Sequence, residues 1–197
     1  MKWMQEYEID GAALQRFMSY TTNPQIRQTS DSIAVRMGRA ATKYGRIFYI
    51  MWDMGAANSD VTNLKNDWTH LVNDLKITES PAYAHQDGKP VVCIWGFGFT
   101  SRTDNTANSL EIINWLKEQG CYVIGGVPAG WRTSNDDSWP GYQNVYKAFD
   151  MISPWLVGRL RMNSLSSNLN TRLKPDMQYC QENGLAYQPV AYPGFAW

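Results

Sequence analysis

The chain has 197 residues, with 18 Lys and Arg against 18 Asp and Glu, so its formal net charge is zero. A neutral chain has no long-range field for a polyanion or an anionic membrane, which argues against nucleic acid as a partner. No apolar run reaches the roughly 20 residues of a membrane span, and residues 1–11 contain no apolar core of a signal peptide. The length fits one domain, and we expect residues 1–197 to form it.

Six short apolar runs are the predicted strands. Helix-length segments separate most of them, an alternation that is typical of βαβ units around a buried parallel sheet. A short amphipathic helix over residues 1–7 precedes the first run. The runs are residues 11–17, 46–53, 91–98, 121–128, 151–158 and 185–193. The sequence therefore predicts an α/β fold with about six parallel strands, too few for a closed eight-stranded barrel.

Capping and breaking residues mark the predicted helices. Gly45 ends the first long helix in a conformation that suits glycine, Ser59 caps the second, and Pro175 should bend or split the last. Asp87 and Gly88 predict the turn of a small hairpin over residues 78–90, before the third strand. The predicted helices cover residues 30–44, 59–75, 108–119, 143–150 and 164–183.

Cysteine and histidine patterns exclude several site chemistries. Cys93, Cys121 and Cys180 have no CxxC spacing, which argues against a zinc site and a disulfide framework, and we expect buried thiols. His70 lies on an amphipathic helix and His85 in the hairpin, and neither accompanies a nucleophile motif. The glycines match neither a dinucleotide fingerprint nor a P-loop. We therefore expect no metal and no cofactor.

Candidate site residues follow from the rule that ligands gather at the carboxyl ends of parallel strands. With nine Trp and eleven Tyr, the chain is rich in rings on which sugars stack, and Arg, Gln and Asp would bind their hydroxyl groups. Core filling by Trp52 and Trp155, and loop capping by Asp53, stay as alternatives. The predicted catalytic acid is Asp53, and the predicted binding residues are Gln15, Arg16, Trp52, Trp95, Arg102, Trp131, Arg132, Trp155, Arg159 and Tyr192.

Consecutive runs along nearly the whole chain carry a family resemblance. They are KWMQEYEIDGAALQRF, AATKYGRIFYIMWDM, DWTHLVNDLKITESPAYAHQDGKPVVCIWGFGF, VIGGVPAGWRT, ISPWLVGR and YPGFAW. In this order they resemble the Bacteroidetes-type proteins grouped with glycoside hydrolase family 99, the endo-α-mannosidases, and its family 71 relatives. The resemblance implies a (β/α)₈ barrel of the TIM type that acts on α-linked carbohydrate in exported glycan degradation. It implies no cofactor, and sometimes a divalent cation nearby.

The departures from that family's pattern shape the functional expectation. In these relatives a strand with an E-x-x-E motif and Gly-Thr follows the point that corresponds to residues 192–197, and the first strand precedes the point that corresponds to Met1. We therefore expect an incomplete barrel without the first and last strands. Glycoside hydrolysis generally needs two carboxyl groups at defined separation. Asp53 stands alone at a strand end, while Asp104, Asp136 and Asp137 lie on loops.

Three function classes stay open at this point. The first is a glycoside hydrolase with weak or altered activity on α-linked oligosaccharide or polysaccharide. The second is a carbohydrate-binding barrel remnant without catalysis. The third is an inactive fragment that forms a homodimer through open sheet edges, because unpaired strand edges are normally covered or paired. The resemblance also implies a secreted or periplasmic protein.

Overall fold

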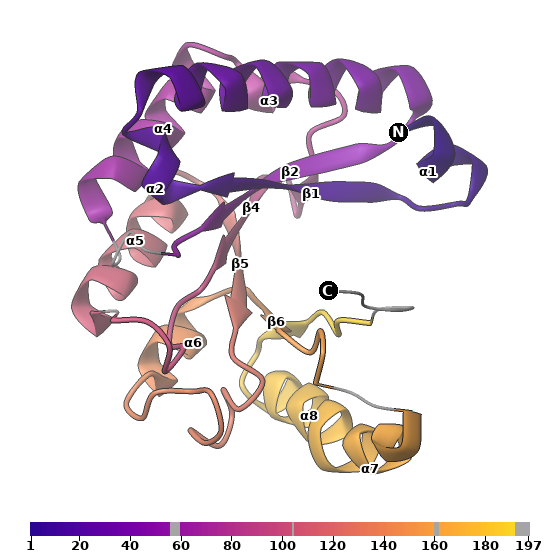
Figure 1. Cartoon of the computed structure of the whole chain (residues 1–197), viewed down its shortest axis with the longest axis vertical. Coiled ribbons are helices and arrows are strands. Elements are labelled where there is room, and N and C mark those ends of the chain that lie inside the picture. Colours follow the sequence, from indigo (N-terminus) through magenta and orange to yellow (C-terminus); the bar gives the residue numbers. More distant parts are fainter. Residues whose placement is uncertain (56–59, 104, 160–161, 192–197) are drawn as a thin grey trace.

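The computed structural model describes residues 1–55, 60–103, 105–159 and 162–191 (Figure 1). Its sheet confirms the predicted α/β fold: six strands follow one another in parallel, and a seventh short strand pairs antiparallel with the third of them. The parallel strands are β1 (Gly11–Phe17), β2 (Ile47–Asp53), β4 (Lys89–Trp95), β5 (Tyr122–Val127), β6 (Met151–Pro154) and β7 (Ala186–Tyr187), and β3 (His85–Gln86) is the antiparallel one. The hairpin turns at Asp87 and Gly88 as predicted, both with positive φ.

Helices line one side of the curled sheet. Figure 1 shows α3, α4, α5, α6 and α8 along the outer side, while the inner, concave side carries no helix. No helix in the described part of the chain has the length and apolarity that crossing a membrane requires. The helices are α1 (Lys2–Glu6), α2 (Met18–Thr21), α3 (Pro24–Tyr44), α4 (Val61–Asn73), η1 (Ile77–Glu79), α5 (Thr106–Glu118), α6 (Gln143–Ala148), η2 (Met162–Ser164), α7 (Leu165–Asn168), η3 (Leu169–Leu173) and α8 (Lys174–Glu182).

Local capping explains where the helices begin and end. The Asn23 side chain accepts hydrogen bonds from two backbone N–H groups of α3, so this helix starts six residues earlier than its apolar pattern predicts. Gly45 ends it with φ of 59°, as predicted. Ser59, the predicted cap of α4, lies outside the described residues, and Asp60 caps that helix instead. Pro175 does not split the last helix, because the π-helical η3 precedes it and leads directly into α8.

The two faces of the sheet are packed unequally. The main core lies between the sheet and the helices, with Phe48, Ile50 and Trp52 of β2 fully buried in it. A smaller cluster on the concave face centres on Val91 and Cys93. All three cysteines are buried and free, and burial raises the pKa of the Cys93 thiol to about 12. The thiols therefore act as small core side chains, as expected.

The sheet stays open at both ends. Strands β1 and β7 are the two ends of the strand order, and they do not pair with each other within the residues that the structure describes. Within residues 185–191, the described part of the last predicted strand, Ala186 and Tyr187 pair with β6. The architecture is therefore a partial barrel of the TIM type, as the strand count predicts.

Candidate functional site

The strand register assembles one row of side chains across the concave face. Phe17 pairs with Asp53, Asp53 with Trp95, Trp95 with Gly126, and Gly126 with Ser153. Paired residues of neighbouring parallel strands point to the same face, so five strands contribute to one row. The row lies at or next to the carboxyl ends of these strands. This is the edge at which parallel α/β sheets bind ligands.

Asp53 is the acidic centre of this row. Its carboxylate accepts hydrogen bonds from Gln15 Nε2 at 2.9 Å and from the Gly55 N–H at 2.8 Å. The Arg102 Nη1 atom lies 3.3 Å from Asp53 Oδ1 in an ion pair. Asp53 itself is only 6% exposed. The carboxylate is thus held in place by three donors from β1, its own loop and the loop after β4, and the structure brings the predicted binding residues Gln15 and Arg102 together with Asp53.

Aromatic rings gather beside Asp53. The Arg102 guanidinium lies over the Trp95 ring at 4.5 Å from the centroid, and Phe99 and Trp155 contact the same indole at centroid distances of 5.1 and 5.3 Å. Gly126 makes this packing possible, because a Cβ there would overlap the Trp95 ring. Trp155 is 37% exposed, so its outer surface can contact a ligand.

One polar atom in this aromatic cluster lacks a partner. The Trp95 Nε1 atom is buried and makes no hydrogen bond within the described residues. A buried N–H without an acceptor is costly, and native proteins rarely leave one in place. A ligand hydroxyl group that reached this atom after a small movement of the neighbouring rings would satisfy it. The cluster therefore combines stacking surfaces with an unused donor.

The loop after β5 forms the next part of the rim. Asp137 accepts hydrogen bonds from the N–H groups of Ala129 and Gly130, and it pairs with Arg159 Nη2 at 2.7 Å. Trp139, which the sequence reasoning did not select, is 41% exposed and donates its indole N–H to the Arg102 backbone oxygen at 2.9 Å. Its exposure results from the shape of the loop, for which the sequence carries no signal. Arg159 keeps a side chain that is 41% exposed.

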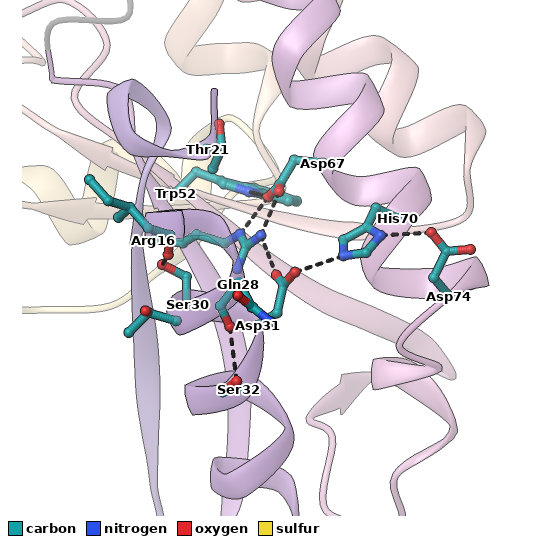
Figure 2. Close-up of polar contacts among 12 residues, drawn as sticks. Arg16, Thr21, Gln28, Ser30, Asp31, Ser32, Trp52, Asp67, His70 and Asp74 are labelled. Atoms are coloured by element: carbon teal, nitrogen blue, oxygen red, sulfur yellow. Dashed lines mark hydrogen bonds and ion pairs between the residues drawn. The ribbon is translucent and has the colours of Figure 1, made fainter. Parts of the chain in front are cut away.

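Two predicted binding residues, Arg16 and Trp52, belong to the core instead. Figure 2 shows Arg16 between the carboxylates of Asp67 and Asp31, with Nε to Asp67 Oδ2 and Nη2 to Asp31 Oδ1 both at 2.7 Å. Trp52 donates its indole N–H to Asp67 at 2.9 Å. Arg16 is 3% exposed and Trp52 is fully buried. Their side chains point toward the helices, because neighbours along a strand alternate between faces and Asp53 already occupies the concave side.

A histidine extends this buried network toward the surface. The two ring nitrogens of His70 lie 2.9 Å from Asp31 and 2.7 Å from Asp74 (Figure 2). The carboxylates of Asp31 and Asp67 thereby connect α3 and α4 through Arg16 of β1. The network is structural, because it lies on the side of the sheet opposite to Asp53.

Trp131 and Arg132 are likewise placed away from the Asp53 row. Trp131 is fully buried and donates its indole N–H to Asp176 of α8 at 3.2 Å, while Arg132 Nε lies 2.7 Å from the same carboxylate. Burial raises the pKa of Asp176, although Arg132 and Trp131 act in the opposite direction. The polypeptide turns outward after β5, which the sequence did not indicate. Tyr192 and Asp104 lie outside the described residues.

The site does not fit a bound metal ion. Both oxygens of Asp53 already accept N–H donors, and a cation beside Oδ1 would have to displace the Arg102 guanidinium. No group of three or more His, Cys, Asp or Glu side chains within the described ranges could hold a metal ion. We therefore derive no step through a divalent cation at Asp53.

Comparisons with known proteins support the fold. A solved structure described as a "Glycoside hydrolase-like protein" is similar to this chain with a TM-score of 0.63 and 13% sequence identity. The similarity covers 98% of this chain and 63% of the other, so this chain spans less than two thirds of that protein's length. No protein-family model matches the chain, and no curated protein matches it in sequence. At this identity the match shows a glycoside hydrolase-like fold, in agreement with the partial barrel.

Proposed function

We propose that this protein binds α-linked oligosaccharide or polysaccharide at the aromatic row around Asp53, with weak or absent hydrolysis. The observation that carries the proposal is the contact between Trp95, Trp155 and Arg102 beside a fixed carboxylate at the carboxyl edge of the sheet. Indole faces stack on the C–H faces of a sugar, and Arg and Asp side chains bind its hydroxyl groups.

The substrate class comes from two sources of support. The glycoside hydrolase-like fold fits a carbohydrate ligand. The resemblance to endo-α-mannosidases favours an α-linked glycan, and it favours action in a secreted or periplasmic location. The proposed link to polysaccharide degradation is binding of the polysaccharide, with little or no cleavage by this chain.

The expectation of weak hydrolysis rests on the contacts of the carboxylates of Asp53 and Asp137. Retaining and inverting glycosidases both place a second carboxyl group within about 5–9.5 Å of the first. In the part of the chain that the structure describes, the hydrogen-bond partners of Asp53 are an amide, a backbone N–H and a guanidinium. Asp137 on the rim is engaged by Arg159 and two N–H groups. Within the described residues no carboxyl group shares a hydrogen bond with Asp53, and the role proposed for Asp53 is to orient hydroxyl groups.

Titration calorimetry with α-manno- and α-gluco-oligosaccharides tests the binding proposal. Trp155→Ala should weaken binding about fivefold or more, since loss of ring stacking on a bound sugar costs about 1 kcal/mol or more. Trp3→Ala is the matched control, because Trp3 is 77% exposed on α1, outside the proposed site. Absence of heat with every sugar, or equal affinity of wild type and Trp155→Ala, would refute the proposal.

Turnover measurements test the hydrolysis part separately. With labelled α-linked oligosaccharides we expect rates far below the 1–10³ s⁻¹ that is typical of enzymes. A rate in that range, abolished by Asp53→Asn, would show that Asp53 is catalytic and that a second acid acts with it.

The open sheet edges favour a second candidate function. The β1 edge has no neighbouring strand within the described residues, and Phe17 on it is 44% exposed. In this second candidate, the chain has no activity on carbohydrate and forms a homodimer through such an edge. This candidate predicts a dimer in sedimentation velocity, together with no sugar binding in the calorimetry described above.

A further inference from the structure

A second polar hollow is lined by the loop after β5, in which the rim residue Asp137 accepts a hydrogen bond from the N–H of Gly130, a lining residue of the hollow. Its volume is about 210 Å³. One wall is the loop that contains Arg132 and Asp136, and the other is the π-helical η3 with the start of α8, which contribute Arg172 and Asp176. We call it the two-arginine hollow. Neither the resemblance nor the predicted binding set points to this arrangement as a whole, because Arg172 and Asp176 lie on a predicted helix.

Both guanidinium groups keep most of their hydrogen-bond donors unused. Arg132 donates through Nε to Asp176, and Arg172 donates through Nη2 to Asp136 at 2.6 Å. Each guanidinium carries five N–H donors. Within the described residues these are the only hydrogen bonds that the two side chains donate. Eight N–H groups therefore remain available on two arginines that line one hollow.

The backbone on both walls adopts costly conformations. Ser134 and Asp136 have positive φ values of 52° and 53°, which non-glycine residues rarely adopt. On the opposite wall, residues 169–173 form a π-helix, a rare form that is frequent at functional sites. Asp137 fixes the loop through two N–H groups, and a Cβ at Gly130 would overlap the backbone of Asn135. Such features persist where the surrounding structure holds them, often at ligand sites.

We propose that the two-arginine hollow binds the carboxylate of an acidic sugar unit, with Arg172 as the principal anchor. This inference rests on the proposed function, since it assigns an acidic residue to the same oligosaccharide ligand. The planar guanidinium fork matches a carboxylate in a bidentate manner. Thr133, Asn135 and Thr171 also line the hollow and supply polar groups for sugar hydroxyls.

The unequal burial of the two acids decides which arginine receives the ligand. Asp136 has a side chain that is 46% exposed, so its ion pair with Arg172 is screened by water and easily exchanged. Asp176 has a side chain that is 5% exposed and also holds the Trp131 indole, so it stays on Arg132. A sugar carboxylate would thus replace Asp136 at Arg172.

The balance of charges in the two-arginine hollow favours a ligand that carries a single negative charge. The hollow contains two arginines and two aspartates, whose charges cancel. When Asp136 turns into solvent, one positive charge remains unbalanced, and a monoanionic carboxylate neutralises it. A phosphate would bring up to two negative charges and leave an excess. The expected ligand is therefore a uronic acid rather than a phosphorylated sugar.

Calorimetry with free glucuronate, glucose and inorganic phosphate as probes tests the inference. We expect glucuronate to bind, glucose to bind more weakly, and Arg172→Gln to weaken glucuronate binding by about tenfold or more, as for loss of a charge-assisted hydrogen bond. Asp136→Asn should strengthen it by up to about fivefold, because it removes the competing carboxylate. Arg36→Gln on the outside of α3 is the matched control for loss of one positive charge.

The outcomes separate this inference from the proposed function. Equal glucuronate affinity in wild type and Arg172→Gln, or a weaker affinity in Asp136→Asn, would overturn it. Phosphate binding as tight as glucuronate binding would also overturn it, because the hollow would then be a general anion site. Binding of neutral α-linked oligosaccharide through Trp155 depends on neither arginine, so its loss or survival reports on the proposed function alone.

Discussion

Replacement of Arg16 by Met distinguishes a structural arginine from a ligand-binding one. Arg16 and Asp67 are 2% and 1% exposed at their side chains, with an Nε to Oδ2 distance of 2.7 Å. Removal of one partner of a buried ion pair typically costs about 3–5 kcal/mol, because the other charge stays buried without its partner. After Arg16→Met, Asp67 would keep the Trp52 indole N–H as its one side-chain donor among the described residues. We expect a loss of this size in the free energy of unfolding.

The same loss can be expressed in observable terms. A total stability of about 5–15 kcal/mol would fall by about a fifth or more, and the midpoint of thermal unfolding would drop by about 6–20 °C. Urea unfolding followed by tryptophan fluorescence measures the change. The double variant Arg16→Met with Asp67→Leu should recover part of it, since no unpaired charge remains between β1 and α4. A free energy of unfolding within about 0.5 kcal/mol of wild type, together with lost oligosaccharide binding, would refute this reasoning and restore Arg16 to the binding set.

Three further predictions follow from single contacts. Gly126→Ala should displace the Trp95 ring and weaken oligosaccharide binding in calorimetry; unchanged affinity would show that the ring position does not matter. Asn23→Ala should reduce the free energy of unfolding by about 1 kcal/mol through loss of the α3 cap, and a change near zero in urea unfolding would contradict that role. Burial raises the pKa of Asp176 above 3.8, so the folded state favours its protonated form and wild type should lose stability relative to Asp176→Asn as the pH rises through that raised value. A difference in unfolding free energy that is independent of pH would contradict it.

The strands and most helices could be predicted from the sequence, because apolar period and capping residues encode them locally. The face to which each strand-end residue points could be predicted only in part. Buried parallel strands are apolar on both faces, so they show no alternation that marks the inner side. The pleat still forbids Gln15 and Arg16, or Trp52 and Asp53, from sharing one face, a constraint that the predicted binding set did not respect.

The exposure and the contacts of the other site residues depend on tertiary geometry. Trp131 and Trp139 follow the same strand, yet one is fully buried and the other is 41% exposed, because the intervening loop turns back on itself through Asp137. Nothing local in the sequence distinguishes them. The pairing of Arg132 with Asp176 joins residues 44 positions apart, a contact that residue spacing cannot reveal.

The indole ¹H–¹⁵N resonances of the tryptophans offer the most direct test of where sugar binds. During titration with an α-linked oligosaccharide, the account predicts that the Nε1–H signals of Trp95 and Trp155 shift, since these rings form the proposed stacking surface. The signals of Trp3 and Trp52 should stay in place, because the first ring lies on α1 and the second is fully buried against the helices. Shifts confined to Trp3 or Trp52, with Trp95 and Trp155 unchanged at saturating sugar, would contradict it.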